Sequence, residues 1–288
     1  MINKILKKEN IMPKNIAKST SGFTNQVYFV DDYVIKFTRE EKTKKQLEKE
    51  INIYKNIKLQ NIPKYISSGT IEDYKYLIIT KLHGKALYSI WHTLNRQDQL
   101  SIVRQIANIL KTFNQLNGDF LDKEYDHTNW LDFVKNNLTN QVLGLKELGF
   151  NTIKLETFIN NDCKKLFTNN KLGLIYNDAH FDNFLFDGKQ VYLIDFDRVI
   201  FGAIDYEMMI FKTMCDIPDK FASEEDYLNC KIEDYNFIYQ EFKNSYPELF
   251  NRVTERRIKI YQFNYLVGQA IKCNDKEWIN RLLKEFGF

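Results

Sequence analysis

The chain has 288 residues, of which 44% are hydrophobic and 27% charged, a composition typical of a globular protein with a substantial core. Its formal net charge of +3 does not indicate nucleic-acid binding, because the lysines are scattered along the sequence rather than clustered. No stretch approaches the roughly 18 apolar residues of a membrane span, and no apolar leader begins the chain. The four cysteines lack metal-site spacing, so we expect reduced thiols and a cytoplasmic protein.

The first 80 residues predict a small sheet interrupted by one helix. Short runs rich in β-branched and aromatic residues, typical of strands, lie at 26–30, 33–37, 65–69 and 76–80. Between the second and third runs, Thr38 and Glu41 have the spacing of a capping box. We therefore expect a helix that begins at Thr38 and ends near Ile57.

One acidic residue lies on the apolar face of this predicted helix. Glu50 follows Leu47 by three residues and precedes Tyr54 by four, so it shares their stripe. Burying a carboxylate without a partner is costly, and Lys36 in the preceding strand is a candidate partner. A strand lysine paired with a helix glutamate holds the α- and β-phosphates in kinases. We expect Lys36 and Glu50 to do this; the alternative is a solvated helix with an incidental glutamate.

The pattern changes after residue 84 and becomes mostly helical, with apolar residues at three- and four-residue steps between Leu100 and Phe113. This contrast predicts a bilobal α+β fold. We expect a sheet-rich N-terminal lobe at 1–82 and a larger helical lobe at 83–288, with the connection at 81–84.

One short hairpin is expected inside the helical part. Two apolar runs at 184–186 and 191–194 flank Asp187-Gly188, a strong turn signal. With a loop at 187–190, residue 186 faces 191 and residue 183 faces 194. Asn183 and Asp195 then meet at the open end of the hairpin.

A third polar residue, Asp178, precedes Asn183 by five residues, and Asp195 follows Asn183 by twelve. Mg²⁺ prefers hard oxygen ligands and takes one or two from the protein, which Asn183 and Asp195 can supply. A separate carboxylate must orient the attacking hydroxyl and accept its proton, and we assign this role to Asp178. Each residue alone reads as an ordinary turn residue; the set indicates phosphoryl transfer from a nucleotide.

These residues resemble the catalytic core of the aminoglycoside phosphotransferase and choline kinase group, which has a protein-kinase-like fold. That group carries His-x-Asp-x-His-x-x-Asn followed by Ile-Asp-(Trp/Phe)-(Asp/Glu), and here Asp178, His180, Asn183 and 194–197 stand in register. Tyr176 departs from the pattern, because it stands where the group usually has histidine. We interpret His180 as positioning the loop.

The resemblance extends to the nucleotide side of the site. Gly22 and Asn25 fall on the group's Gly-x-x-Asn-x-Val-Tyr loop, which implies phosphate binding, and glycine allows close backbone approach. The segment 77–87 resembles the group's strand-to-linker stretch, which implies that backbone from Thr80 to Leu82 meets the base. The resemblance leaves ATP or GTP open as the nucleotide.

A downstream segment, Gly202 to Met208, resembles the group's Gly-Asp-Pro-x-Tyr-Asp-Leu motif. Glu207 falls on the second Asp of that motif, a scaffold position. Asp205 departs from the pattern, and the simplest expectation is an exposed side chain.

The acceptor, a small molecule with a hydroxyl group, is left open by the sequence. A cationic aminoglycoside needs an acidic wall, and 223–226 with Glu233 and Asp234 could supply one, although acids also suit a helix N-terminus. A choline-type acceptor instead favours aromatic walls. Candidates for these walls are Tyr235, Phe237, Tyr239, Tyr261 and Phe263, residues that at helical spacing usually form a core.

We therefore expect a small-molecule kinase that transfers the γ-phosphoryl group of ATP or GTP to a hydroxyl, as aminoglycoside phosphotransferases do. A choline-like amino alcohol, a sugar, a nucleoside or a macrolide remains open as its acceptor. Two other classes of protein remain as alternatives. A regulatory pseudokinase is disfavoured because Lys36, Asp178, Asn183 and Asp195 are all present. A protein kinase is disfavoured because six residues between Asp195 and Gly202 are too few for a peptide-docking segment.

Overall fold

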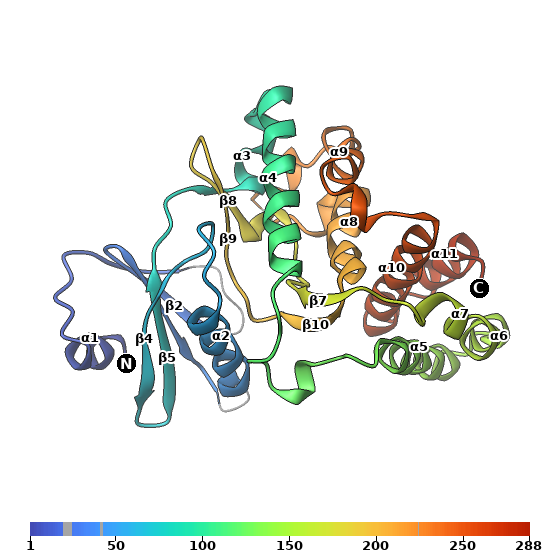
Figure 1. The fold of residues 1–288 in the computed structure, drawn as a ribbon, viewed down its shortest axis with the longest axis horizontal. Helices are drawn as coiled ribbons and strands as arrows, with labels where there is room; N and C mark the ends of the chain where they lie inside the picture. Colours follow the sequence, from blue (N-terminus) through green and yellow to red (C-terminus); the bar gives the residue numbers. More distant parts are fainter. Residues whose placement is uncertain (20–24, 41–42, 224) are drawn as a thin grey trace. The chain divides into compact units, whose positions relative to one another are not determined.

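A computed structural model describes residues 1–19, 25–40, 43–223 and 225–288. Its contacts divide the chain into two compact units (Figure 1). The first comprises Met1–Ile90, Asp119–Asp122 and Phe181–Arg198; the second comprises Trp91–Gly118, Lys123–His180 and Val199–Phe288. The functional lobe boundary after Leu82 stays a prediction.

The first unit is built on a five-stranded antiparallel sheet in the order β1-β2-β3-β5-β4. The strands are β1 (Ile16–Lys18), β2 (Asn25–Val30), β3 (Tyr33–Thr38), β4 (Tyr65–Ile71) and β5 (Tyr74–Thr80). Ile35 and Phe37 pack with Ile5 of helix α1 (Ile2–Lys8) in one apolar cluster. Because side chains alternate along a strand, Lys36 points to the opposite face.

Helix α2 (Lys44–Asn56) starts later than the capping box predicted. Thr38 is the last residue of β3, and its hydroxyl accepts a hydrogen bond from the Lys75 N–H at 3.2 Å. A hydroxyl engaged in the sheet does not cap a helix, and Thr43 occupies the N-cap position instead. Glu41 lies outside the described residues. The expected end near Ile57 is confirmed, since Ile57 is the C-cap.

The predicted hairpin is present with the predicted register. Strands β8 (Phe184–Phe186) and β9 (Val191–Leu193) pair antiparallel, with Phe186 opposite Val191. The Ile194 N–H donates to the Asn183 carbonyl at 3.0 Å, which extends the pairing to the open end. Strand β6 (Lys85–Ala86) joins β8, and the short helix α3 (Leu87–Ile90) follows it.

The second unit is mostly helical, as Figure 1 shows. Its helices are α4 (Arg96–Asn114), α5 (Trp130–Glu147), α6 (Ile153–Asn161), α7 (Cys163–Phe167), α8 (Met208–Asp216), α9 (Ile238–Ser245), α10 (Arg252–Lys272) and α11 (Lys276–Phe286). Strands β7 (Leu172–Ile175) and β10 (Ile200–Ala203) form a two-stranded sheet beside them. Gly173 on β7 lies so close to α4 that a Cβ there would stand 2.0 Å from the Asn114 carbonyl oxygen, so this crossing requires glycine.

Short 3₁₀ helices connect these elements. They are Trp91–Thr93, Lys123–Tyr125, η4 (Phe181–Asn183), η5 (Ile204–Glu207), η6 (Pro218–Lys220), η7 (Tyr227–Asn229), η8 (Ile232–Asp234) and Pro247–Leu249. The tight 3₁₀ turn is a poor hydrogen-bonding geometry, so such pieces depend on tertiary contacts for their position.

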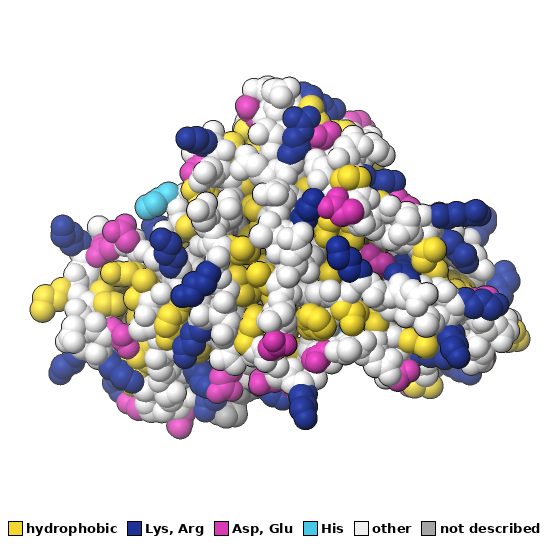
Figure 2. All heavy atoms as spheres, viewed as in Figure 1, with side chains coloured by type: hydrophobic (Ala, Val, Ile, Leu, Met, Phe, Trp, Pro, Cys, Tyr) yellow, Lys and Arg dark blue, Asp and Glu magenta, His cyan; other side chains and the backbone are white. Residues whose placement is uncertain are grey.

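Surface and thiol features agree with the composition. Lysine and arginine side chains are spread over the face seen in Figure 2, with acidic side chains among them. Within the described chain no disulfide joins the four cysteines, and Cys163 and Cys215 are buried. None of the described helices is both long enough and apolar enough to cross a membrane.

Candidate active site

A buried ion cluster in the first unit contains three of the predicted site residues. Lys36 Nζ lies 2.6 Å from Glu50 Oε1 and 3.0 Å from Asp195 Oδ1. The Lys36 and Glu50 side chains are 11% and 1% exposed, whereas the Asp195 side chain is 46% exposed. The predicted contact between strand lysine and helix glutamate is therefore present, and it opens to solvent at Asp195.

Burial and charge act against each other in this cluster. Burial acts to lower the pKa of Lys36, but the carboxylates of Asp195 and Glu50 outweigh it and hold that pKa well above its ordinary value. Burial raises the pKa of Glu50 to about 7, against the opposing charge of Lys36. The lysine therefore stays charged, while the charge of Glu50 depends on pH near neutrality.

The expected metal ligands, Asn183 and Asp195, both belong to the first unit. Asn183 is buried at the end of η4, and its carbonyl receives the Ile194 N–H, which ties it to the residue before Asp195. Asp195 has a φ of +63°, in the left-handed region that non-glycine residues seldom adopt. The Asn183 amide and the partly exposed Asp195 carboxylate carry oxygen ligands of the kind that suits Mg²⁺, which keeps several of its waters. Among the described residues no group of three or more His, Cys, Asp or Glu residues could hold a metal ion.

Asp178 lies in the second unit, on the loop after β7, and its side chain is 22% exposed. The preceding residue, Asn177, has a φ of +63°. Glu207 holds this loop with two hydrogen bonds, because its carboxylate accepts the Tyr176 N–H at 2.7 Å and the Asn177 N–H at 3.1 Å. Burial raises the pKa of Glu207 to about 7, and the two backbone donors oppose that rise. Glu207 thus occupies the scaffold position expected for it.

Two neighbours of Asp178 complete the loop. The His180 N–H donates to the Asp178 carbonyl at 2.8 Å, and His180 Nε2 lies 3.5 Å from Asp178 Oδ2. These contacts support the interpretation of His180 as a loop-positioning residue. Tyr176, which replaces the group's histidine, is fully buried with its ring edge-on to Phe113 at 6.4 Å. An apolar contact therefore anchors the loop at this position.

The remaining nucleotide-site predictions have different outcomes. Gly22 lies outside the described residues. Asn25 begins β2 and is buried, and its Oδ1 has no hydrogen-bond partner among the described residues. Thr80 ends β5, where its hydroxyl accepts the Lys64 N–H at 2.8 Å. The chain leaves the sheet after it, and Leu82 is half-buried in an irregular segment. Nucleotide contacts by these residues stay predictions.

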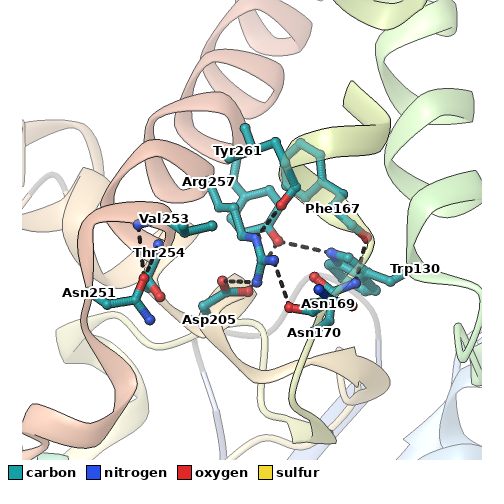
Figure 3. A network of polar contacts seen from close by, with 11 residues as sticks. Trp130, Phe167, Asn169, Asn170, Asp205, Asn251, Val253, Thr254, Arg257 and Tyr261 are labelled. Atoms are coloured by element: carbon teal, nitrogen blue, oxygen red, sulfur yellow. Dashed lines mark hydrogen bonds and ion pairs between the residues drawn. The ribbon is translucent and has the colours of Figure 1, made fainter. Parts of the chain in front are cut away.

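The expectation that Asp205 is exposed was wrong. Asp205 is 4% exposed and lies in η5, two residues before Glu207. Arg257 Nη1 donates to Asp205 Oδ2 at 3.2 Å, and the Tyr261 hydroxyl donates to Asp205 Oδ1 at 3.1 Å (Figure 3). No local pattern in the sequence indicates this contact, because Arg257 and Tyr261 lie 52 and 56 residues from Asp205.

An aromatic contact beside the Asp178 loop lies close in sequence to the predicted acidic wall. The Phe221 ring lies 6.1 Å from the His180 ring and 6.4 Å from that of Tyr265. The acidic segment begins two residues after Phe221, with Glu225 exposed. No α-helix begins there, because the chain forms the short 3₁₀ turns η7 and η8. Glu224 lies outside the described residues.

A separate cavity of about 600 Å³ lies among α8, α10 and α11. Its charged lining is Lys212, Asp216, Arg256, Lys259, Arg281 and Glu285, which is predominantly basic. Its lining contains no residue of the Asp178 loop and none of 223–226, Glu233 or Asp234, so it is not the acidic wall expected for a cationic acceptor.

The aromatic residues considered for a choline-type wall are mostly in the core. Tyr235, Tyr261 and Phe263 are at most 2% exposed. Phe237 is half-buried under the Arg96 guanidinium, 3.5 Å from its ring centre, and the Tyr239 hydroxyl donates to Glu255. An aromatic ring that is buried among other core residues is not accessible to a choline-type acceptor.

Three features are typical of a kinase-like phosphotransferase. They are the sheet with the buried Lys36–Glu50 pair, the hairpin that ends in Asn183 and Asp195, and the loop that carries Asp178. A sequence profile of the phosphotransferase enzyme family matches residues 16–227, and the chain belongs to that family. It is therefore a small-molecule kinase that acts on a hydroxyl group. No curated protein sequence matches the chain.

Solved structures agree on the fold. The ternary complex of streptomycin, ATP and APH(2'')-IIa has a TM-score of 0.71 at 19% identity and covers 99% of this chain and 94% of that one. ADP-bound APH(2'')-Ib gives 0.69 at 18% identity, covering 99% and 95%. A choline/ethanolamine kinase family protein from Mesorhizobium loti gives 0.58 at 9% identity, covering 99% and 93%.

Proposed function

We propose that this chain transfers the γ-phosphoryl group of ATP to a hydroxyl of an aminoglycoside-like acceptor in the cytoplasm. The observation that carries the proposal is the cluster in which buried Lys36 contacts both Glu50 and partly exposed Asp195. The similarity to ATP- and ADP-bound phosphotransferases supports ATP as the nucleotide, with GTP as the alternative to test. Buried single thiols support a reducing compartment.

Each site residue has a specific role in this proposal. Lys36, oriented by Glu50, binds the α- and β-phosphates as a fixed positive charge. Asn183 and Asp195 would hold Mg²⁺, which neutralises phosphate charge when bound. Asp178 orients the acceptor hydroxyl and accepts its proton during in-line attack. Gly22, Asn25 and the backbone at Thr80 and Leu82 complete the proposed nucleotide site.

The aminoglycoside preference rests on the surroundings of the Asp178 loop. Phe221 against His180 brings the start of the acidic segment beside the loop, and Asp226 accepts there from the Ser223 hydroxyl at 3.1 Å. Exposed carboxylates attract a polycationic acceptor. The choline alternative is not favoured, because its candidate aromatic residues are mostly buried in the core.

The first test is nucleotide turnover with a panel of acceptors. ADP or GDP release is measured with Mg²⁺ and aminoglycosides, choline-like amino alcohols, macrolides, sugars or nucleosides. We expect release that depends on an aminoglycoside and on ATP. Release that depends on a different acceptor class would correct the substrate, and no acceptor-dependent release with any class would contradict the proposal.

A second test examines the acidic wall. Glu225→Gln with Asp226→Asn should raise the KM for the aminoglycoside and leave the KM for ATP unchanged, because only the acceptor loses attractive charge. Glu147→Gln, an exposed carboxylate at the end of α5, is the matched control. An unchanged acceptor KM in the double variant would remove this segment from the acceptor site.

A further inference from the structure

We propose that Arg257 and Asp205 are positioning residues that hold the loop carrying Asp178, acting through η5 and Glu207. This inference rests on the proposed function for its kinetic consequence, but the contacts that carry it lie within the second unit alone. None of the residues of the nucleotide cluster takes part in them.

A buried ion pair joins α10 to η5. Arg257 on α10 and Asp205 on η5 are 7% and 4% exposed. Burying two charges costs free energy that an apolar pair of similar volume would not require. Such a pair contributes little to stability, and a role in fixing one geometry accounts for its presence.

Each nitrogen of the Arg257 guanidinium and each carboxylate oxygen of Asp205 makes a hydrogen bond to the protein (Figure 3). Arg257 Nε donates to the Leu166 carbonyl at 2.7 Å and Nη2 to the Asn169 carbonyl at 2.8 Å, while Nη1 reaches Asp205. The other oxygen of Asp205 receives the Tyr261 hydroxyl, which itself accepts the Trp130 Nε1–H at 2.8 Å. One guanidinium therefore joins α10 to α7, to the segment after α7 and to η5 with directional bonds.

Contacts from η5 reach the loop that carries Asp178. Helix η5 has only four residues, too few to fix its own position, so its tertiary partners must do so. Asp205 and Glu207 lie in this same short element, and Glu207 accepts the N–H groups of Tyr176 and Asn177. Asn177 is held in the left-handed region, a conformation that persists only where surrounding contacts impose it. Asp178 is the next residue.

Loss of the Arg257–Asp205 pair should therefore lower turnover without weakening nucleotide binding. Loss of Arg257 releases η5, and Glu207 then no longer holds Asn177, so Asp178 moves relative to the acceptor. Displacement of about 1 Å from a remote substitution can lower turnover by about 10²-fold. Nucleotide binding should be preserved, because Lys36, Glu50 and Asp195 belong to the first unit.

The kinetic test compares Arg257→Met and Asp205→Asn with Arg256→Met, an exposed neighbour on the same helix. We expect kcat to fall by about 10²-fold in both network variants, with the KM for ATP within about twofold of wild type and with Arg256→Met like wild type. A wild-type kcat in the network variants, or a parallel loss in nucleotide binding, would overturn the proposal.

A second measurement, amide hydrogen exchange, does not depend on activity. In the double variant Arg257→Met with Asp205→Asn, which leaves neither charge buried without its partner, we expect the Tyr176 and Asn177 amides to exchange about tenfold faster or more, while amides in the middle of α4 keep their wild-type rates. Uniform acceleration of all slow amides would indicate a merely structural pair, and unchanged exchange would remove the link; either result overturns the proposal. If wild type transfers no phosphoryl group, the proposed function fails and the exchange rates alone decide the positioning role.

Discussion

Each of the two units contains a buried ion cluster, and these two clusters differ in their exposure to solvent. In the first unit the Lys36–Glu50 pair is buried, but its third member, Asp195, has a side chain 46% exposed. In the second unit the side chains of Arg257 and Asp205 are only 8% and 6% exposed, and both make hydrogen bonds to other protein groups. An open cluster can receive a ligand, whereas a closed one can only fix geometry.

This comparison predicts that the largest loss of turnover comes from substitution of Asp195, the partly exposed residue of the open cluster. Asp195→Asn should lower turnover by about 10³-fold, because a bound metal ion contributes several kcal/mol of transition-state stabilisation. Steady-state turnover at several Mg²⁺ concentrations measures it. Asp187→Asn at the tip of the same hairpin keeps its turn oxygen and is the control. Equal turnover in the two variants would contradict the assignment of Asp195.

The buried part of the open cluster should control stability. Lys36→Met leaves Glu50 buried without its partner, which we expect to lower the free energy of unfolding by about 3–5 kcal/mol at pH 8. The loss should shrink at pH 5, because Glu50, with a pKa of about 7, is then protonated. Urea unfolding at both pH values measures this, and a pH-independent loss would contradict the pairing.

The pH dependence of activity gives a smaller effect. Below about pH 7 Glu50 becomes protonated and Lys36 loses this charge partner, so kcat/KM for ATP should fall on the acid side. The stability contribution of Glu50 has the opposite sign: its pKa is raised above 4.5, so the contribution is complete below pH 4.5 and is lost as the pH rises through about 7. Glu50→Gln should abolish the acid limb of kcat/KM, and an unchanged limb would assign it to another group.

The smallest effect is expected at an exposed ion pair. Lys4 and Glu72 have side chains 60% and 55% exposed, and solvent screens such pairs strongly. Lys4→Met should leave the urea midpoint within error of wild type. A loss as large as that of Lys36→Met would show that exposure does not separate the two kinds of pair.

The sequence predicted those parts of the site that follow local rules. The hairpin register and the contact of Lys36 with Glu50 come from alternation in a strand and periodicity in a helix. Asp205 was missed because its partner Arg257 is 52 residues away. Thr38 was misassigned as a cap because Lys75, 37 residues away, occupies its hydroxyl. Both errors arise from contacts distant in sequence, which local patterns do not encode.

In the proposed function Asp178 activates an acceptor hydroxyl for phosphoryl transfer. Acceptor-dependent ADP release is the direct measurement, made on wild type and on Asp178→Asn alongside ATP affinity by calorimetry. We predict that the variant binds ATP as wild type does and loses about 10²–10⁴-fold in turnover, the contribution typical of a positioned acid or base. Full turnover by Asp178→Asn would contradict the account.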